Sequence, residues 1–230
     1  MIAVVPAVSA VAWTPCYRLI PSRFPPTGLY DRVASPEDLD SVFAVEAMTN
    51  PRLRQEAGQL SLVTPEDRIT GPGTQPIMAA FTHLNPEGSR FSDGTWGVYY
   101  AARSLDTAIA ETMHHRAQFL ERTREGPIEI DMRAYYADLR GELHDIRGRR
   151  DLADVYDPVN HAPGQAMGRS LRSAGSNGVV YDSVRDPGGE CAGVFRAPVL
   201  SNCVQGPHFG YCWDGRRIVT VYEKTQIRDF

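Results

Sequence analysis

The sequence predicts an α+β fold, a single domain with central β-sheets and flanking helices, and three observations lead to this prediction. Proline and glycine punctuate the whole chain, with 17 Pro and 20 Gly among 230 residues, which favours many short elements over a helical bundle. Residues 104–122 have the apolar spacing of an amphipathic helix. Strand-like segments rich in β-branched and aromatic residues precede and follow it, as expected for the α+β class.

The first part of the chain contains a short apolar start and a long turn-rich stretch. Residues 1–14 are expected to form a tail or a first strand, because they lack a basic signal-peptide region and are too short to span a bilayer. Ser35, followed by proline and two acidic residues, predicts the start of a helix that ends before Pro51. Residues 35–80 together are expected to be a helical or loop insertion, or a lid.

The later elements have clearer signals. Residues 95–101 read as a strand whose two faces alternate, with Val98 and Tyr100 on one face and Tyr99 on the other. Ser104 is a suitable cap for the helix that follows it. The remaining elements are expected as a strand at 128–132, a helix at 164–174 closed by Gly175, strands at 178–184 and 191–196, and a C-terminal extension packed on the domain at 201–230.

Composition limits the classes of function. The net charge of −4 gives no general attraction to nucleic acid or to an anionic membrane, and no apolar run is long enough to span a membrane. The four cysteines are Cys16, Cys191, Cys203 and Cys212, and their spacing fits no zinc motif. We therefore expect reduced thiols in a cytoplasmic protein without a metal site, although a Cys203–Cys212 disulfide stays open in a secreted context.

Two charged residues are candidates for chemistry. Arg90 lies in a polar loop that leads into a strand, and its planar guanidinium suits a phosphate group. Glu111 lies at the rim of the buried stripe of the strongest helix, where a carboxylate could stabilise the positive charge that develops when a ribosyl bond breaks. On the pattern alone, an exposed loop arginine and a solvated helical glutamate remain open alternatives.

Three further polar residues lie at the ends of strands. Tyr100 could stack on a ring or donate a hydrogen bond, or be an ordinary half-buried strand residue. Ser183 ends an apolar strand without a G-x-S-x-G motif, so a binding role is favoured over a nucleophilic one. Arg185 and the two glycines after it could form a phosphate-contacting turn, although a hairpin turn explains the glycines equally well. Neither the dinucleotide-binding G-x-G-x-x-G nor the phosphate-binding G-x-x-x-x-G-K-[ST] motif occurs in a suitable place.

Taken together, these segments resemble the RES domain family, which is named for an arginine, a glutamate and a serine. The resemblance covers most of residues 15–200. It runs through Tyr17-Arg18, Ser89-Arg90-Phe91, the Gly-Val-Tyr-Tyr-Ala segment 97–101, the Thr-Ala-Ile-Ala-Glu segment 107–111, the Gly-Val-Val-Tyr-Asp-Ser segment 178–183 and the strand 188–195.

The resemblance implies a fold and an activity. Members are similar in fold to ADP-ribosyltransferase toxins, and many are toxins of toxin–antitoxin modules that degrade NAD⁺ by splitting its nicotinamide–ribose bond. The acceptor is water or inorganic phosphate as a co-substrate, and NAD⁺ is the substrate, with no other cofactor implied. Some members transfer ADP-ribose to a protein instead. The usual partner is an Xre-type helix-turn-helix antitoxin that blocks the cleft, and a homo-oligomer is left open.

The same resemblance implies roles for individual residues. Arg90 is expected to bind the phosphates or ribose of NAD⁺, Glu111 to be the catalytic carboxylate, Tyr100 to hold the nicotinamide or shape its pocket, and Ser183 to contact the nicotinamide ribose. The candidates for further substrate binding are Arg18, His83 and Arg185. On the residues alone, a non-catalytic module that binds a nucleotide or a partner also stays open.

Overall fold

The structure is a computed structural model that describes residues 5–21, 59–225 and 227. The helix expected to begin at Ser35 lies outside these residues. The described elements are β1 (Val8–Pro21), η3 (Leu60–Leu62), η4 (Pro65–Asp67), α3 (Gln75–Thr82), β2 (Tyr99–Ala102), α4 (Leu105–Thr123), β3 (Ile128–Asp145), η5 (Arg150–Tyr156), α5 (Ala162–Ser173), β4 (Gly178–Asp182), β5 (Glu190–Val194), η6 (Ala197–Val199), β6 (Leu200–Trp213) and β7 (Ile218–Lys224).

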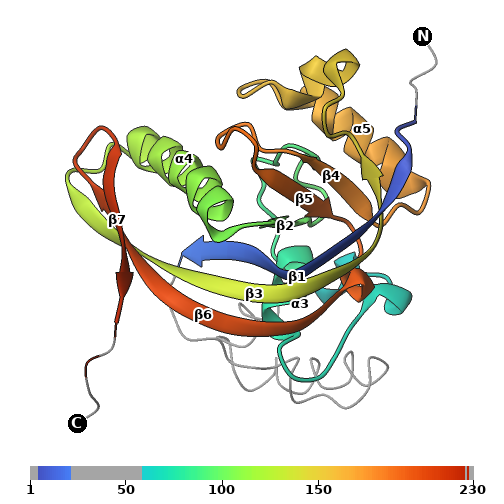
Figure 1. The fold of residues 1–230 in the computed structure, drawn as a ribbon, viewed down its shortest axis with the longest axis horizontal. Helices are drawn as coiled ribbons and strands as arrows, with labels where there is room; N and C mark the ends of the chain where they lie inside the picture. Colours follow the sequence, from blue (N-terminus) through green and yellow to red (C-terminus); the bar gives the residue numbers. More distant parts are fainter. Residues whose placement is uncertain (1–4, 22–58, 226, 228–230) are drawn as a thin grey trace.

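The strands are hydrogen-bonded in the order β1-β2-β5-β4-β3-β6-β7, and β1 also pairs with β3. The long strand β3 connects two groups of strands. One of its edges pairs with β1, while the other pairs with β6 as far as Leu139 and then with β4 from His144. Figure 1 shows β1, β3 and β6 as a curved band, with the short strands β2, β5 and β4 on its concave side. This arrangement of helices on a mixed sheet confirms the expected α+β class.

Two apolar clusters form the core, one on each face of β2. Tyr99 and Ala101 belong to the first cluster, which also contains α3. Val98 and Tyr100 belong to the second cluster, on the side of α4 and α5. The alternation expected for residues 95–101 is therefore present, and it sends successive side chains into different cores.

The predicted bounds of an element agree best with the structure where its local sequence signal is strongest. The helix expected at 104–122 is α4, and Ser104 caps it by accepting a hydrogen bond at 3.1 Å from the backbone N–H of Thr107. The strand expected to begin at 95 begins only at Tyr99. Of the preceding residues, Gly97 approaches α3, since a Cβ on it would lie 2.3 Å from the carbonyl oxygen of Ala80.

Two other expectations differ in extent from the structure. The strand expected at 128–132 continues to Asp145, a length of 18 residues. Residues 201–230 were expected as a C-terminal extension, and their described part continues the sheet as most of β6 and all of β7. All four cysteines have free thiols, so the Cys203–Cys212 pair is not bridged. Among the described residues, no helix is long and apolar enough to cross a membrane.

Candidate functional site

A short hydrogen bond between two side chains forms the centre of the candidate site. The hydroxyl of Ser183 donates to Oε1 of Glu111 at 2.6 Å. The same Oγ accepts hydrogen bonds from the backbone N–H groups of Arg185, at 3.1 Å, and Asp186, at 3.0 Å. A hydroxyl has one proton and two lone pairs, so the amides occupy both lone pairs and the proton goes to Glu111. Ser183 therefore orients the carboxylate and is not poised as a nucleophile.

Two rigid elements bring these residues together from distant parts of the sequence. Glu111 is partly buried in the second turn of α4, whose neighbouring residue Ala108 is anchored in the core. Ser183 directly follows the buried strand β4, and its backbone N–H donates to the carbonyl of Gly189 at 2.8 Å, which closes the β4–β5 turn. The hydroxyl and the carboxylate are thus held by a helix and a strand end.

Two arginines are fixed beside this pair by backbone carbonyls. Nη1 of Arg90 donates to the carbonyls of Val155, at 2.7 Å, and Asp157, at 3.1 Å. Nη2 of Arg185 donates to the carbonyl of Pro158 at 3.1 Å. A guanidinium has five N–H donors, so both arginines retain donors after these bonds. Within the described part of the chain, neither forms an ion pair with a carboxylate.

Two histidines near the arginines have lowered pKa values. Burial lowers the pKa of His114, and the positive charge of Arg185 lowers it further. Burial also lowers the pKa of His161, with added contributions from Arg90 and Arg185. Both imidazoles are therefore neutral at pH 7. The two guanidinium groups keep free donors that suit a phosphate or pyrophosphate group, while the carboxylates of Glu111 and Asp157 oppose the lowering of these histidine pKa values in part.

Tyr100 supports the loop that carries Arg90. Its hydroxyl accepts from the backbone N–H of Phe91 at 2.9 Å and shares a 2.8 Å hydrogen bond with Ser89 Oγ. Its ring stacks on Phe91, with centroids 6.4 Å apart, and burial raises the pKa of Tyr100 to about 12. These bonds fix the residues on both sides of Arg90, so the hydroxyl of Tyr100 has a bracing role.

Two glycines of α5 position the same loop, and the sequence reasoning did not identify them. A Cβ on Gly164 would lie 2.4 Å from the carbonyl oxygen of Arg90, and one on Gly168 would lie 2.0 Å from that of Phe91. Only glycine allows this close approach between the helix and the loop. Their spacing of four residues inside a predicted helix was the signal that could have found them.

Glu111, Ser183, Arg90 and Arg185 together are called the Glu111 cluster. The structure does not bring Arg18 and His83 to this cluster. Arg18 lies over the Tyr99 ring, 4.7 Å from its centroid, and donates to the carbonyl of Tyr100 at 3.0 Å. Tyr99 faces the first core cluster, so Arg18 lies on the other side of β2 from Glu111. His83 is exposed at the C-terminal end of α3, with Nδ1 at 3.2 Å from the carbonyl oxygen of Ala79.

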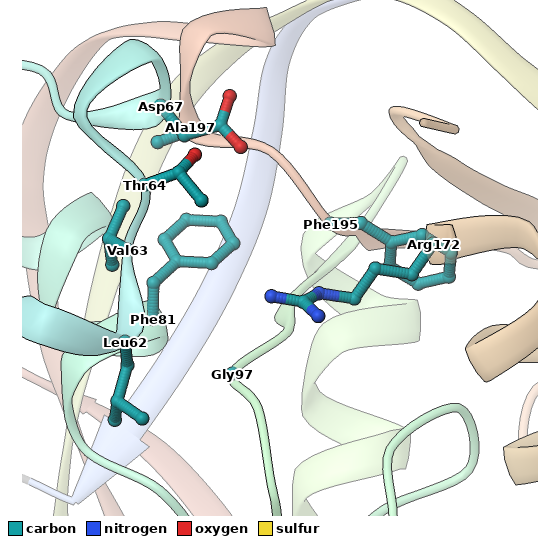
Figure 2. Close-up of a pocket in the computed structure, with 9 residues that line it drawn as sticks. All are labelled: Leu62, Val63, Thr64, Asp67, Phe81, Gly97, Arg172, Phe195 and Ala197. Atoms are coloured by element: carbon teal, nitrogen blue, oxygen red, sulfur yellow. The ribbon is translucent and has the colours of Figure 1, made fainter. Parts of the chain in front are cut away.

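A separate hollow lies next to η3 and η4, away from these polar groups. It has a volume of about 320 Å³, including space open to solvent. Figure 2 shows the Arg172 side chain reaching into it between Phe81 and Phe195. None of its lining residues belongs to the Glu111 cluster, so we place the candidate chemistry at the charged cluster. Within the described ranges, no three His, Cys, Asp or Glu side chains group in a way that could hold a metal ion.

Comparisons with known proteins identify the family. Residues 65–214 match the model of the RES domain. The protein y4oC of Sinorhizobium fredii (strain NBRC 101917 / NGR234), which is described as uncharacterized, is 35% identical over 209 residues, covering 90% of this chain and 86% of that protein. A chain in the crystal structure of the M. tuberculosis MbcT–MbcA toxin–antitoxin complex aligns with a TM-score of 0.47 and 13% identity, covering 86% of each chain. The matched range contains Arg90, Tyr100, Glu111 and Ser183. The resemblance expected from the sequence is confirmed, and the chain belongs to the RES domain family.

Proposed function

We propose that this protein is a toxin enzyme that degrades NAD⁺ by cleaving its nicotinamide–ribose bond. The observation that carries the proposal is the fixed Glu111 carboxylate, oriented at 2.6 Å by Ser183, beside two guanidinium groups that retain free donors. Membership of the RES domain family supports the same activity.

The chemistry needs a carboxylate at the ribose and donors at the pyrophosphate. Nicotinamide is positively charged when bonded to ribose, so the C1″–N bond breaks with its electron pair passing to the nicotinamide nitrogen. The ribose becomes an oxocarbenium ion, which the Glu111 carboxylate stabilises in a preorganised position. An oxygen of water or inorganic phosphate then forms the new bond to C1″ and releases its proton to solvent. Arg90 and Arg185 bind the pyrophosphate, because planar guanidinium groups match its oxygens in pairs.

The direct test is to incubate the purified protein with adenine-labelled NAD⁺, with and without phosphate, and to identify the products by mass. We expect free nicotinamide together with ADP-ribose or, in phosphate, ADP-ribose-1″-phosphate. Label on a protein band would point instead to ADP-ribosyl transfer. An absence of NAD⁺ loss at stoichiometric enzyme would overturn the enzymatic proposal and favour a module that only binds.

The role of Glu111 has a matched test on the same helix. Glu111→Gln keeps an oxygen that can accept from Ser183 but removes the charge, so we expect NAD⁺ turnover to fall on the order of a hundred- to a thousandfold. The control is Glu121→Gln, which changes an exposed residue of α4. Equal turnover in the Glu111 variant and the control would sink the assignment.

We also propose a cognate antitoxin with a helix-turn-helix domain as the partner, and the cytoplasm as the place of action. Family membership motivates both, since the activity needs a supply of NAD⁺ and a means of protecting the producing cell. Co-expression should restore growth of cells that make the protein, and the two chains should purify together. Growth arrest by the Glu111→Gln variant would speak against NAD⁺ loss as its cause.

A further inference from the structure

A second group of hydrogen bonds joins α4 to the β4–β5 turn, one helical turn before Glu111. Oγ1 of Thr107 donates to Oδ2 of Asp186 at 2.6 Å. The Ser104 hydroxyl lies 2.7 Å from Oγ1 of Thr107. Thr107 is almost fully buried, with 1% exposure, so solvent does not compete strongly for these bonds.

The donors and acceptors in this group have only one consistent direction. An ionised carboxylate only accepts, so the proton of Thr107 points to Asp186. The hydroxyl of Ser104 must then donate to Thr107. On the turn, the backbone N–H of Asp186 donates to Ser183 Oγ at 3.0 Å, and Ser183 donates to Glu111 at 2.6 Å. One directed path thus connects the start of α4 to the candidate catalytic carboxylate.

Gly189 closes around the same contact. A Cβ at this position would lie 2.6 Å from Asp186 Oδ2 and 2.6 Å from Thr107 Oγ1. No other residue fits there without displacing one of these two oxygens. The second glycine of the turn is therefore explained by the approach of the Thr107–Asp186 pair.

We propose that Thr107 and Asp186 are positioning residues for Glu111, which act by holding the β4–β5 turn so that its amides fix Ser183. The proposal rests on the proposed NAD⁺ cleavage for its kinetic test only. When the Thr107 hydroxyl is absent, Asp186 loses its anchor on α4 and its amide no longer fixes Ser183 Oγ. The serine proton can then turn away, and Glu111 loses the bond that orients it.

The first test is kinetic and uses variants that differ by single groups. Thr107→Val keeps the shape and removes the hydroxyl, and it should lower kcat by roughly ten- to a hundredfold with KM unchanged, because a small misplacement of a reacting group is costly. Thr107→Ser should restore most of the loss. Thr123→Val is the matched control, since the Thr123 hydroxyl donates to the carbonyls of Phe119 and Leu120 on the same helix. A raised KM with unchanged kcat would overturn the proposal.

The second test asks whether Thr107 acts through Ser183. In a Ser183→Ala background, Thr107→Val should cause no further loss of kcat, because the serine through which it acts is already gone. Asp186→Ala should give the same non-additive pattern, and it covers the case in which the buried valine variant folds poorly. Losses that multiply in the double variants would show that Thr107 and Ser183 act independently.

The third test needs no catalysis and therefore separates this proposal from the proposed function. The amides of Arg185 and Asp186 bond Ser183 Oγ, so they should be protected from hydrogen exchange in the native protein. Thr107→Val should speed exchange at both amides, whereas Thr123→Val should leave it unchanged. Unchanged exchange in Thr107→Val would refute the positioning role. If the variants show this exchange pattern but the wild-type protein leaves NAD⁺ intact, only the proposed activity is refuted.

Discussion

At the scale of single residues, the site combines a serine whose donor and acceptor capacity is filled with two arginines that retain unbonded N–H donors. Ser183 accepts hydrogen bonds from two backbone amides and donates one to Glu111. Arg90 and Arg185 are anchored through backbone carbonyls and keep other N–H groups. A fixed carboxylate and incompletely used guanidiniums together suit a ligand that is anionic at one end and becomes cationic at the other.

The charge of Arg185 should be visible in the titration of its neighbours. Burial and the arginine charges hold the pKa of His114 and His161 below the ordinary value of 6.5. Arg185→Ala should raise both values, as followed by NMR of the imidazole protons. Lys224→Ala on β7 should shift neither one, because Lys224 pairs with Glu129 and Asp131. Unchanged histidine pKa values in the Arg185 variant would contradict the electrostatic description of the site.

These histidines also give stability a defined pH dependence. Their pKa is lower in the folded state, so below pH 6.5 the unfolded chain binds more protons than the folded one. Their contribution to the free energy of unfolding is therefore lost as the pH falls from 6.5 toward the folded-state pKa, and it is complete above 6.5.

Tyr100 offers a test of the bracing role. Tyr100→Phe leaves the Phe91 amide without its partner, which should reduce the free energy of unfolding by about 1–3 kcal/mol. Urea unfolding measures the loss, and Tyr222→Phe on an exposed part of β7 is the control. A variant as stable as the control would show that the hydroxyl does not support the loop.

The sequence pointed to residues whose chemistry is distinctive. It did not point to residues whose role comes from the close approach of another segment of the chain. Glu111, Arg90 and Ser183 were predicted from residue type and from the family resemblance. Thr107 and Gly168 were not, because an ordinary helical threonine or glycine gains its role only from the backbone that approaches it. That approach depends on the packing of segments far apart in the chain.

At the scale of elements, helices with complete local signals were predictable and long strands were not. The cap at Ser104 and the apolar stripe defined α4 to within one or two residues. Only the first residues of β3 were predicted. The strand pairs with β1, β4 and β6, all distant in the sequence, and its pairing with β1 and β6 contains register shifts. Tertiary pairing, and not local propensity, decides where this strand ends.

The contact between α5 and the Arg90 loop gives an element-scale prediction. Gly168→Ala places a methyl group against the carbonyl of Phe91, so the helix must move and the free energy of unfolding should fall by about 1–3 kcal/mol or more. Gly126→Ala is the matched control, because a Cβ there meets nothing within 4 Å. If the two variants unfold at the same urea concentration, the close approach of α5 is not as described.

At the scale of the whole molecule, the two groups of strands bury most of the thiols. Cys16, Cys191 and Cys203 are buried, and Cys212 is partly exposed. Burial raises the pKa of Cys16 to about 12, and burial likewise raises that of Cys191. The two cores therefore make the thiols a measure of global folding.

A thiol-labelling experiment tests this prediction. The native protein should react at Cys212 alone, and all four thiols should react after denaturation. Cys212→Ser should leave the native protein almost unreactive. Rapid labelling of Cys16 in the native state would mean that the region between β1 and β3 opens without global unfolding.

The strand order was beyond prediction from the sequence, since it depends on which distant segments meet. The α+β class followed from punctuation and periodicity, but the bridging position of β3 between β1, β6 and β4 leaves no local signal. The pairing of β6 with β3 was hidden for the same reason. The β6–β7 hairpin is different, because its turn at Asp214-Gly215 is a local signal that the sequence analysis did not use.

The bond between Ser183 and Glu111 joins residues 72 positions apart, and this separation determines when the site can form during synthesis. A ribosome makes α4 well before β4 and β5, and β2 has no partner in β5 until the later strand has emerged. The nascent chain therefore carries an unoriented glutamate through much of its translation. The oriented carboxylate forms only after nearly the whole domain has left the ribosome, so on the proposed function an incomplete or prematurely released chain would lack a working site.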